Sequence, residues 1–113
     1  MESLKRIAAD IYTCLGRGRS EAVYQKAFEV GLRHENISYD DQVPVIIKYL
    51  GQPVGIERAD LLVNNEIIVE LKATKALRSD DRDQLRRYLV DLDRTRGLLV
   101  GFGAKLEVEE ISC

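Results

Sequence analysis

The sequence has few of the residues that cross-link small folds or bind zinc. Its two cysteines, Cys14 and Cys113, cannot form a disulfide framework, and Cys14 falls in an apolar helical pattern where we expect a core residue. His34 is the only histidine, so it has no histidine partner for a zinc site. These shortages exclude a disulfide-rich scaffold and argue against a cysteine nucleophile.

The chain also lacks an excess of positive charge and any long hydrophobic run. Its formal net charge is -2 and its pI is near 5.5, so no global positive field draws it onto nucleic acid. No segment approaches the ~18 consecutive apolar residues of a membrane span, and the N-terminus has no signal-peptide pattern. We expect a cytoplasmic protein with no membrane partner, whose affinity for phosphate is local.

The residues that are present predict one α/β domain over residues 1–113. The hydrophobic share of 45% and the charged share of 32% are typical of a folded chain of this length. Apolar spacing predicts helices over 4–15, 21–33 and 80–93, with Val23, Ala27, Val30 and Gly31 facing inward on the second. Strands are expected within 37–54, with a turn at 51–53, and over 55–63, 67–73, 98–102 and 105–111. The order is therefore ααβββαββ, a mixed sheet flanked by helices.

The register of two neighbouring strands follows from their apolar residues. Five odd-numbered positions around the Asn64-Asn65 turn are apolar and belong together against the core: Leu61, Val63, Ile67, Val69 and Leu71. This requires a three-residue loop or a bulge rather than a two-residue turn. Asp60 then lies opposite Glu70, and Lys72 projects from the same face as Glu70.

Two carboxylates held close together repel each other, and a hard divalent cation relieves that repulsion through oxygen ligands. We expect Mg²⁺ or Mn²⁺ to be bound by Asp60, Glu70 and the carbonyl of Leu71. Lys72 could then orient or activate a water and stabilise negative charge on a reacting phosphate. This combination suits the attack of a metal-bound water on a phosphoryl group.

The residues Asp60 and Glu70-Leu71-Lys72 resemble the signature of the PD-(D/E)XK nuclease superfamily. Further motifs are similar to its GxxExxY family: Gly18, Glu21 and Tyr24 in one helix, Gln84 and Tyr88 in another, and Gly101-Phe102-Gly103 ending a strand. The resemblance implies a restriction-endonuclease-like fold and a metal-dependent nuclease. It further implies metal-ligating Asp60 and Glu70, a catalytic Lys72 and an additional acid, Glu21.

The same resemblance places Gln84 and Tyr88 beside the site, with Gln84 among the catalytic residues. Arg17 and Arg19 make the glycine turn unusually basic, and with Tyr24 and Tyr88 they are the candidates for nucleic-acid contact, DNA being favoured over RNA. Because the domain is too small for a separate DNA-reading module, we expect a homodimer or a partner protein to supply specificity.

Each of these residues also has a purely structural interpretation. Glu21 suits a helix N-terminus, Gln84 and Tyr88 could simply pack, and a Glu-x-Lys pattern on a strand is usually a solvated salt-bridge face. The arginines between 78 and 87 alternate with aspartates, which indicates a solvated charged face. The alternative function is a catalytically inactive nuclease-like domain that binds nucleic acid or protein.

Overall fold

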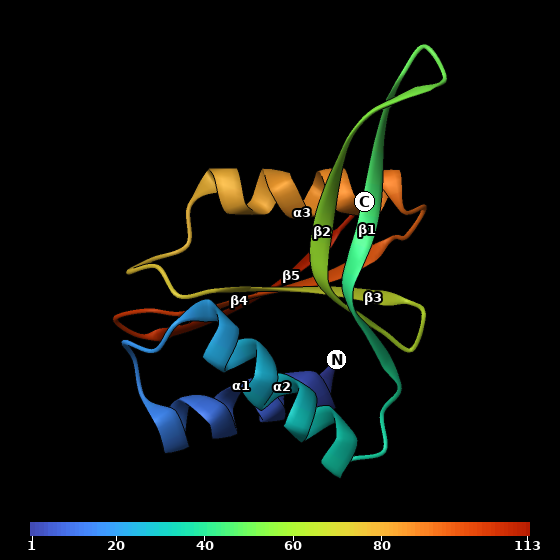
Figure 1. Cartoon of the computed structure of the whole chain (residues 1–113). Helices are drawn as coiled ribbons and strands as arrows, with labels where there is room; N and C mark the ends of the chain where they lie inside the picture. Colours follow the sequence, from blue (N-terminus) through green and yellow to red (C-terminus); the bar gives the residue numbers. More distant parts are fainter.

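A computed structural model describing residues 1–113 has two helices on one face of a five-stranded sheet and one helix on the other (Figure 1). The strand order is β1-β2-β3-β4-β5, and only the pair β3 and β4 is parallel. This confirms the expected order and mixed sheet. The elements are α1 (Glu2–Leu15), α2 (Glu21–His34), β1 (Tyr39–Tyr49), β2 (Gln52–Val63), β3 (Ile67–Lys72), α3 (Ser79–Asp91), β4 (Arg96–Phe102) and β5 (Leu106–Ser112).

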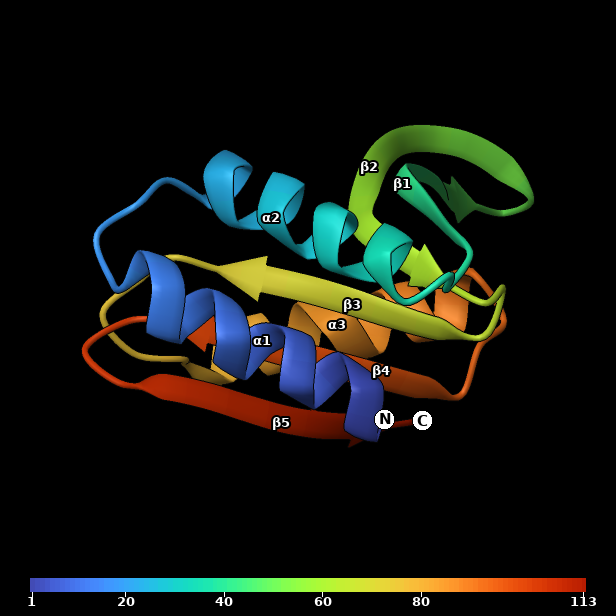
Figure 2. The same ribbon diagram turned by 90° about the horizontal axis from the view of Figure 1, so that it is seen from below.

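Two hydrophobic clusters fill the spaces between the three layers. Seen from below, α1 and α2 lie in front of the sheet and α3 lies behind it (Figure 2). The five odd-numbered apolar residues around the β2–β3 turn all belong to the α1 and α2 cluster, as predicted. Leu62 and Ile68 point to the other face and pack with Leu85, Tyr88 and Leu89 of α3. None of the three helices has the length and apolar composition that a bilayer crossing requires.

The loop between β2 and β3 contains three residues, as the register required. Val63 pairs with Ile67, which leaves Asn64, Asn65 and Glu66 in the turn, and both asparagines have a φ of 54°. The short polar side chain of asparagine tolerates this left-handed conformation. The turn therefore sets the alignment that brings the charged residues of both strands to the same level.

The hairpin of β1 and β2 turns one residue earlier than expected. Leu50 and Gly51 occupy the turn with φ values of 51° and 77°, and Pro53 already lies in β2 opposite Lys48. Two consecutive positive φ values give a tight hairpin whose twist matches that of the strands. The hairpin extends well past α3 in Figure 1.

One burial prediction was wrong in part and another was wrong. Ala27 and Gly31 of α2 lie against the core as expected, whereas Val23 and Val30 are 43% and 49% exposed. Helix α2 buries Tyr24 and Phe28 instead. The aromatic rings offer far more apolar area than valine, so the helix is rotated to place them inward. Cys14 is exposed on α1 rather than part of the core.

Candidate active site

The two predicted carboxylates lie where β2 separates from β3. Regular pairing of the two strands ends at Leu61 and Val69. One residue further, the backbone amide of Asp60 donates to Glu70 Oε2 at 2.6 Å, and the amide of Leu71 donates to Asp60 Oδ2 at 2.8 Å. The two side chains thus replace backbone acceptors, and this reciprocal bonding fixes both carboxylates next to each other.

A twist in β2 at Asp60 produces this geometry. Leu61 packs with α1 and α2, yet Ala59, two residues earlier, packs with α3. Alternate residues of a regular strand point to the same face, so β2 must rotate between them. On the other side, Gln42 of β1 has a φ of 46° and the regular pairing with β2 omits it. Asp60 therefore sits at an irregularity in the sheet.

Burial raises the pKa of both carboxyl groups, and nearby carboxylates raise it further. For Asp60, burial raises the pKa, the bond from the Leu71 amide opposes this, and the charge of Glu21 adds to it. For Glu70, which is only 3% exposed, burial and then the charge of Asp60 raise the pKa to about 8. Near neutral pH the pair therefore retains a proton unless a cation compensates it.

Lys72 lies beside this pair and is held by α3. Its Nζ donates to Gln84 Oε1 at 2.9 Å, and its charge lowers the pKa of both carboxyl groups. The Lys72 side chain is half-buried. The structure thus brings together Asp60, Glu70, Lys72 and Gln84, four of the residues that the sequence singled out.

The donor set suits a divalent cation only in part. Asp60 and Glu70 each keep one carboxylate oxygen that accepts no protein hydrogen bond. The Leu71 carbonyl points toward β2 because, in an extended strand, it lies on the same side as the amide of its own residue. However, no three acidic, histidine or cysteine side chains converge closely enough to form a metal cluster. A cation here would need water and the Leu71 carbonyl to complete its coordination.

Helix α2 faces the carboxylates with Glu21 and with Gln25, a residue that the sequence analysis missed. Glu21 is exposed, and its charge raises the pKa of Asp60 and of Glu70 from the first turn of α2. Gln25 Nε2 donates to the Asp60 carbonyl at 3.2 Å, and Gln25 Oε1 accepts from Gln42. The four-residue spacing from Glu21 was the available signal, because it puts both side chains on one face of the helix.

Two tyrosines expected to contact nucleic acid are buried instead. The Tyr24 ring is fully buried and stacks on Phe102 with centroids 4.2 Å apart, and its hydroxyl donates to the carbonyl of Gly16. Tyr88 is 3% exposed, and burial followed by the charge of Glu70 raises its pKa to about 12. Neither ring therefore presents a face on which a base of a bound strand could stack.

Arg17 and Arg19 lie exposed in the loop between α1 and α2. In this loop Gly18 has a φ of 93°, which disfavours any residue with a side chain. The Tyr24 hydroxyl accepts a hydrogen bond from the Arg19 amide, so the glycine and the tyrosine of this motif shape the loop. Of the three motif residues Gly18, Glu21 and Tyr24, only Glu21 has a side chain that acts on the carboxylates of Asp60 and Glu70.

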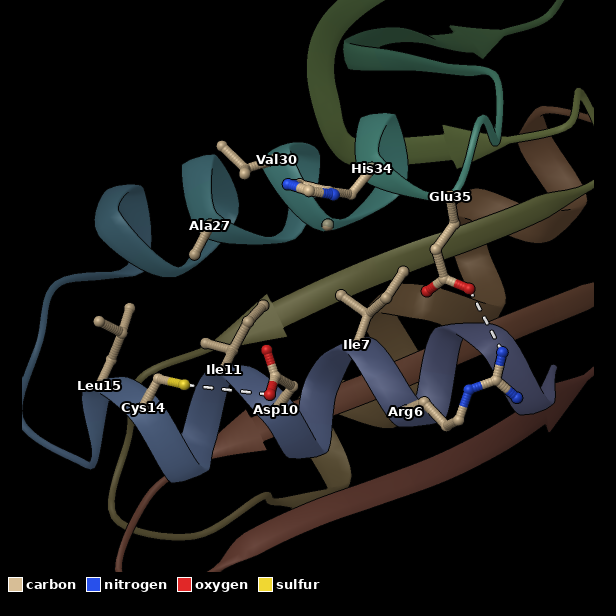
Figure 3. Close-up of a pocket in the computed structure, with 11 residues that line it drawn as sticks. Arg6, Ile7, Asp10, Ile11, Cys14, Leu15, Ala27, Val30, His34 and Glu35 are labelled. Carbon is tan, nitrogen blue, oxygen red and sulfur yellow. Dashed lines mark hydrogen bonds and ion pairs between the residues drawn. The ribbon is translucent and has the colours of Figure 1, made fainter.

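An apolar groove lies elsewhere, between α1 and α2 (Figure 3). Its volume is about 640 Å³, and Ile7, Ile11, Leu15, Ala27 and Val30 contribute to its walls. The carboxylate pair and Lys72 contribute nothing to its lining, so we do not assign the chemistry to this groove.

The chain is similar over nearly its whole length to one family of known proteins. A model of the PD-(D/E)XK nuclease superfamily matches residues 1–112. The chain belongs to the PD-(D/E)XK nuclease superfamily. Asp60 and Glu70-Leu71-Lys72, which the fold brings together, lie within the matched residues. No curated protein is similar enough in sequence to count as a relative.

A solved structure supports this fold. The crystal structure of SSO0001 superposes with a TM-score of 0.62 at 20% sequence identity. The match covers 80% of this chain and 48% of that chain, so this PD-(D/E)XK chain spans about half the length of its neighbour. At this identity the likeness shows the fold alone.

Proposed function

We propose that this chain is a divalent-metal-dependent nuclease that hydrolyses phosphodiester bonds, with DNA favoured over RNA. The observation that carries the proposal is the reciprocal bonding of Asp60 and Glu70 where β2 leaves β3. Burying two neighbouring acids costs free energy, and their raised pKa values express that cost. Such an arrangement suits a cation site better than a structural role.

Mg²⁺ or Mn²⁺ would be held by Asp60, Glu70 and the Leu71 carbonyl, with Glu21 as a further acid at the edge. When bound, such a cation lowers the pKa of water and withdraws charge from a phosphoryl oxygen. The Lys72 ammonium, oriented by Gln84, can position the attacking water and stabilise the charge that develops on the phosphate. We therefore assign Lys72 to catalysis and Gln84 to positioning Lys72.

We further propose that the chain groups with the GxxExxY family. Support comes from the loop before α2. The positive φ of Gly18 and the two hydrogen bonds of the Tyr24 hydroxyl explain why these two residues of the motif are needed there. We propose that a second copy or a partner protein supplies sequence specificity, because these 113 residues form one domain without a separate reading module.

Digestion of labelled DNA and RNA by the purified protein tests the nuclease proposal. We expect cleavage with Mn²⁺ or Mg²⁺ and none with EDTA. Lys72→Met should lower kcat by about 10²- to 10⁴-fold, and Asp60→Asn, which keeps an acceptor for the Leu71 amide, should abolish metal-dependent cleavage. Lys48→Met, an exposed lysine in the β1–β2 hairpin, is the matched control. Full activity of both site variants would end the assignment.

One observation favours a second function, an inactive nuclease-like module that binds nucleic acid or protein. Two of the four carboxylate oxygens of Asp60 and Glu70 are already satisfied by backbone amides, and no third acid completes a cluster. Isothermal titration calorimetry separates the two functions. Absence of Mn²⁺ binding together with retained nucleic-acid binding would favour the module.

A further inference from the structure

A basic pocket lies at the end of the sheet where β3 ends. It is formed by the loop between β3 and α3 and by the turn between β4 and β5, and both lie at the same end of the sheet in Figures 1 and 2. Its volume is about 640 Å³, and its lining includes three cations, Lys75, Arg78 and Lys105. The sequence analysis assigned none of the three to binding.

The three cations of this pocket share one hollow, and none of them has an acidic partner. All are exposed, and none forms an ion pair. The acid in the pocket, Glu107, directs Oε2 to the backbone amide of Leu77 at 2.8 Å. In a chain with a net charge of -2, three unpaired cations in one hollow give a local excess of positive charge, which favours the binding of an anion.

The walls of the pocket are held in place. The Ala104 amide donates to the Lys75 carbonyl at 3.0 Å, which joins the two loops. A Cβ at Gly103 would overlap the Lys75 carbonyl oxygen, so only glycine permits this close approach. Leu77, 8% exposed, anchors the first loop in the core. The cations are therefore presented by a fixed framework, which reduces the ordering cost of binding.

We propose that this pocket binds backbone phosphates of the nucleic acid on one side of the bond being cleaved, an inference that rests on the proposed nuclease function. Lys75 follows Lys72 by three residues, so their Cα atoms are separated by at most about 11 Å. At roughly 3.4 Å of helix axis per phosphate in one strand, this distance corresponds to at most about three phosphates. The pocket thus extends the substrate path from the carboxylates along the loop that follows β3.

Arg17 and Arg19 add to the positive charge at this end of the molecule. The loop that carries them also lies at the end where β3 finishes, in both views (Figures 1 and 2). Tyr12, near the end of α1, donates to the Gly103 carbonyl at 2.7 Å and so fastens this end of α1 to the turn beside the pocket. The loop arginines can therefore contribute to the same phosphate path.

The test compares nucleic-acid binding by the wild type and by the K75Q/R78Q/K105Q variant in EDTA, where cleavage does not interfere. The control variant, K26Q/K48Q/R87Q, removes three other exposed cations that form no ion pairs. For a labelled oligonucleotide, we expect the pocket variant to raise Kd by about tenfold or more. It should also reduce the slope of log K against log salt by roughly two to three. Equal unfolding temperatures would exclude a folding defect.

The outcomes separate this inference from the nuclease proposal. If the pocket and control variants bind alike while the wild type still cleaves with Mn²⁺, the inference fails and the nuclease stands. If only the pocket variant loses binding and the wild type never cleaves, the pocket stands and the nuclease fails. Oligonucleotides with a 5′-phosphate or a 5′-hydroxyl should bind equally. A strict requirement for the terminal phosphate would overturn the assignment to backbone phosphates.

Discussion

Replacing Glu70 by glutamine should stabilise the protein at alkaline pH when no divalent cation is present. When Glu70 is protonated, its buried side chain is neutral. Above its pKa the side chain carries a negative charge in a buried site next to Asp60, which lowers the stability of the folded state. Glutamine removes that charge and keeps an amide oxygen to accept the hydrogen bond from the Asp60 amide. The variant therefore isolates the cost of ionising this one group.

The size of the effect follows from the pKa of Glu70, which rises from 4.5 to about 8 on folding. At 1.36 kcal/mol per pKa unit this corresponds to an upper limit of about 5 kcal/mol. Between pH 4.5 and about 8, Glu70 keeps its proton in the folded state but has lost it in the unfolded state. Its contribution to the free energy of unfolding is therefore fully present below pH 4.5 and is lost as pH rises through about 8. Because the glutamine amide must also be desolvated, we expect a net gain of about 2–3 kcal/mol at pH 9.

Urea unfolding followed by circular dichroism at pH 5 and pH 9, both with EDTA, measures this difference. The Glu70→Gln variant should gain about 2–3 kcal/mol at pH 9, equivalent to about 10 °C in Tm, and almost none at pH 5. Glu66→Gln is the control, because Glu66 is exposed and its bond to Arg96 is at the surface. A variant no more stable than the wild type at pH 9, or equally stabilised at both pH values, would refute the reasoning. Added Mn²⁺ should stabilise the wild type at pH 9 and leave Glu70→Gln unchanged.

Three further predictions concern stability. Tyr24→Phe keeps the ring stack and removes the hydroxyl bonds that hold the loop before α2, so we expect a loss of about 1–2 kcal/mol in chemical denaturation. Gly103→Ala should cost at least about 2 kcal/mol, because the new Cβ would overlap the Lys75 carbonyl; a Tm unchanged from the wild type would contradict this packing. Arg82→Gln should lower the Tm only slightly, because its bonds to Glu109 are partly exposed, and the loss should shrink in 1 M salt. A salt-independent loss would show that packing, not charge, is responsible.

Periodicity along the chain was enough to predict the order of the elements and the register of β2 against β3. The register could be derived because an error of one residue would have placed the apolar residues of both strands on the wrong face. The inward face of α2 was predicted only in part, since Val23 and Val30 also fit a helical stripe and only packing against Phe102 favours Tyr24. Gln25 was missed because its contact is with a backbone carbonyl on a distant strand.

The sequence by itself therefore determined which acids and which amine could meet, because strand pairing and the alternation of side chains are local rules with few solutions. Tertiary structure decided what surrounds them. The twist of β2 at Asp60, the burial that raises the pKa of Glu70, and the gathering of Lys75, Arg78 and Lys105 all depend on elements far apart in the chain. Burial and charge proximity are properties of packed layers, and no spacing along a single strand or helix specifies them.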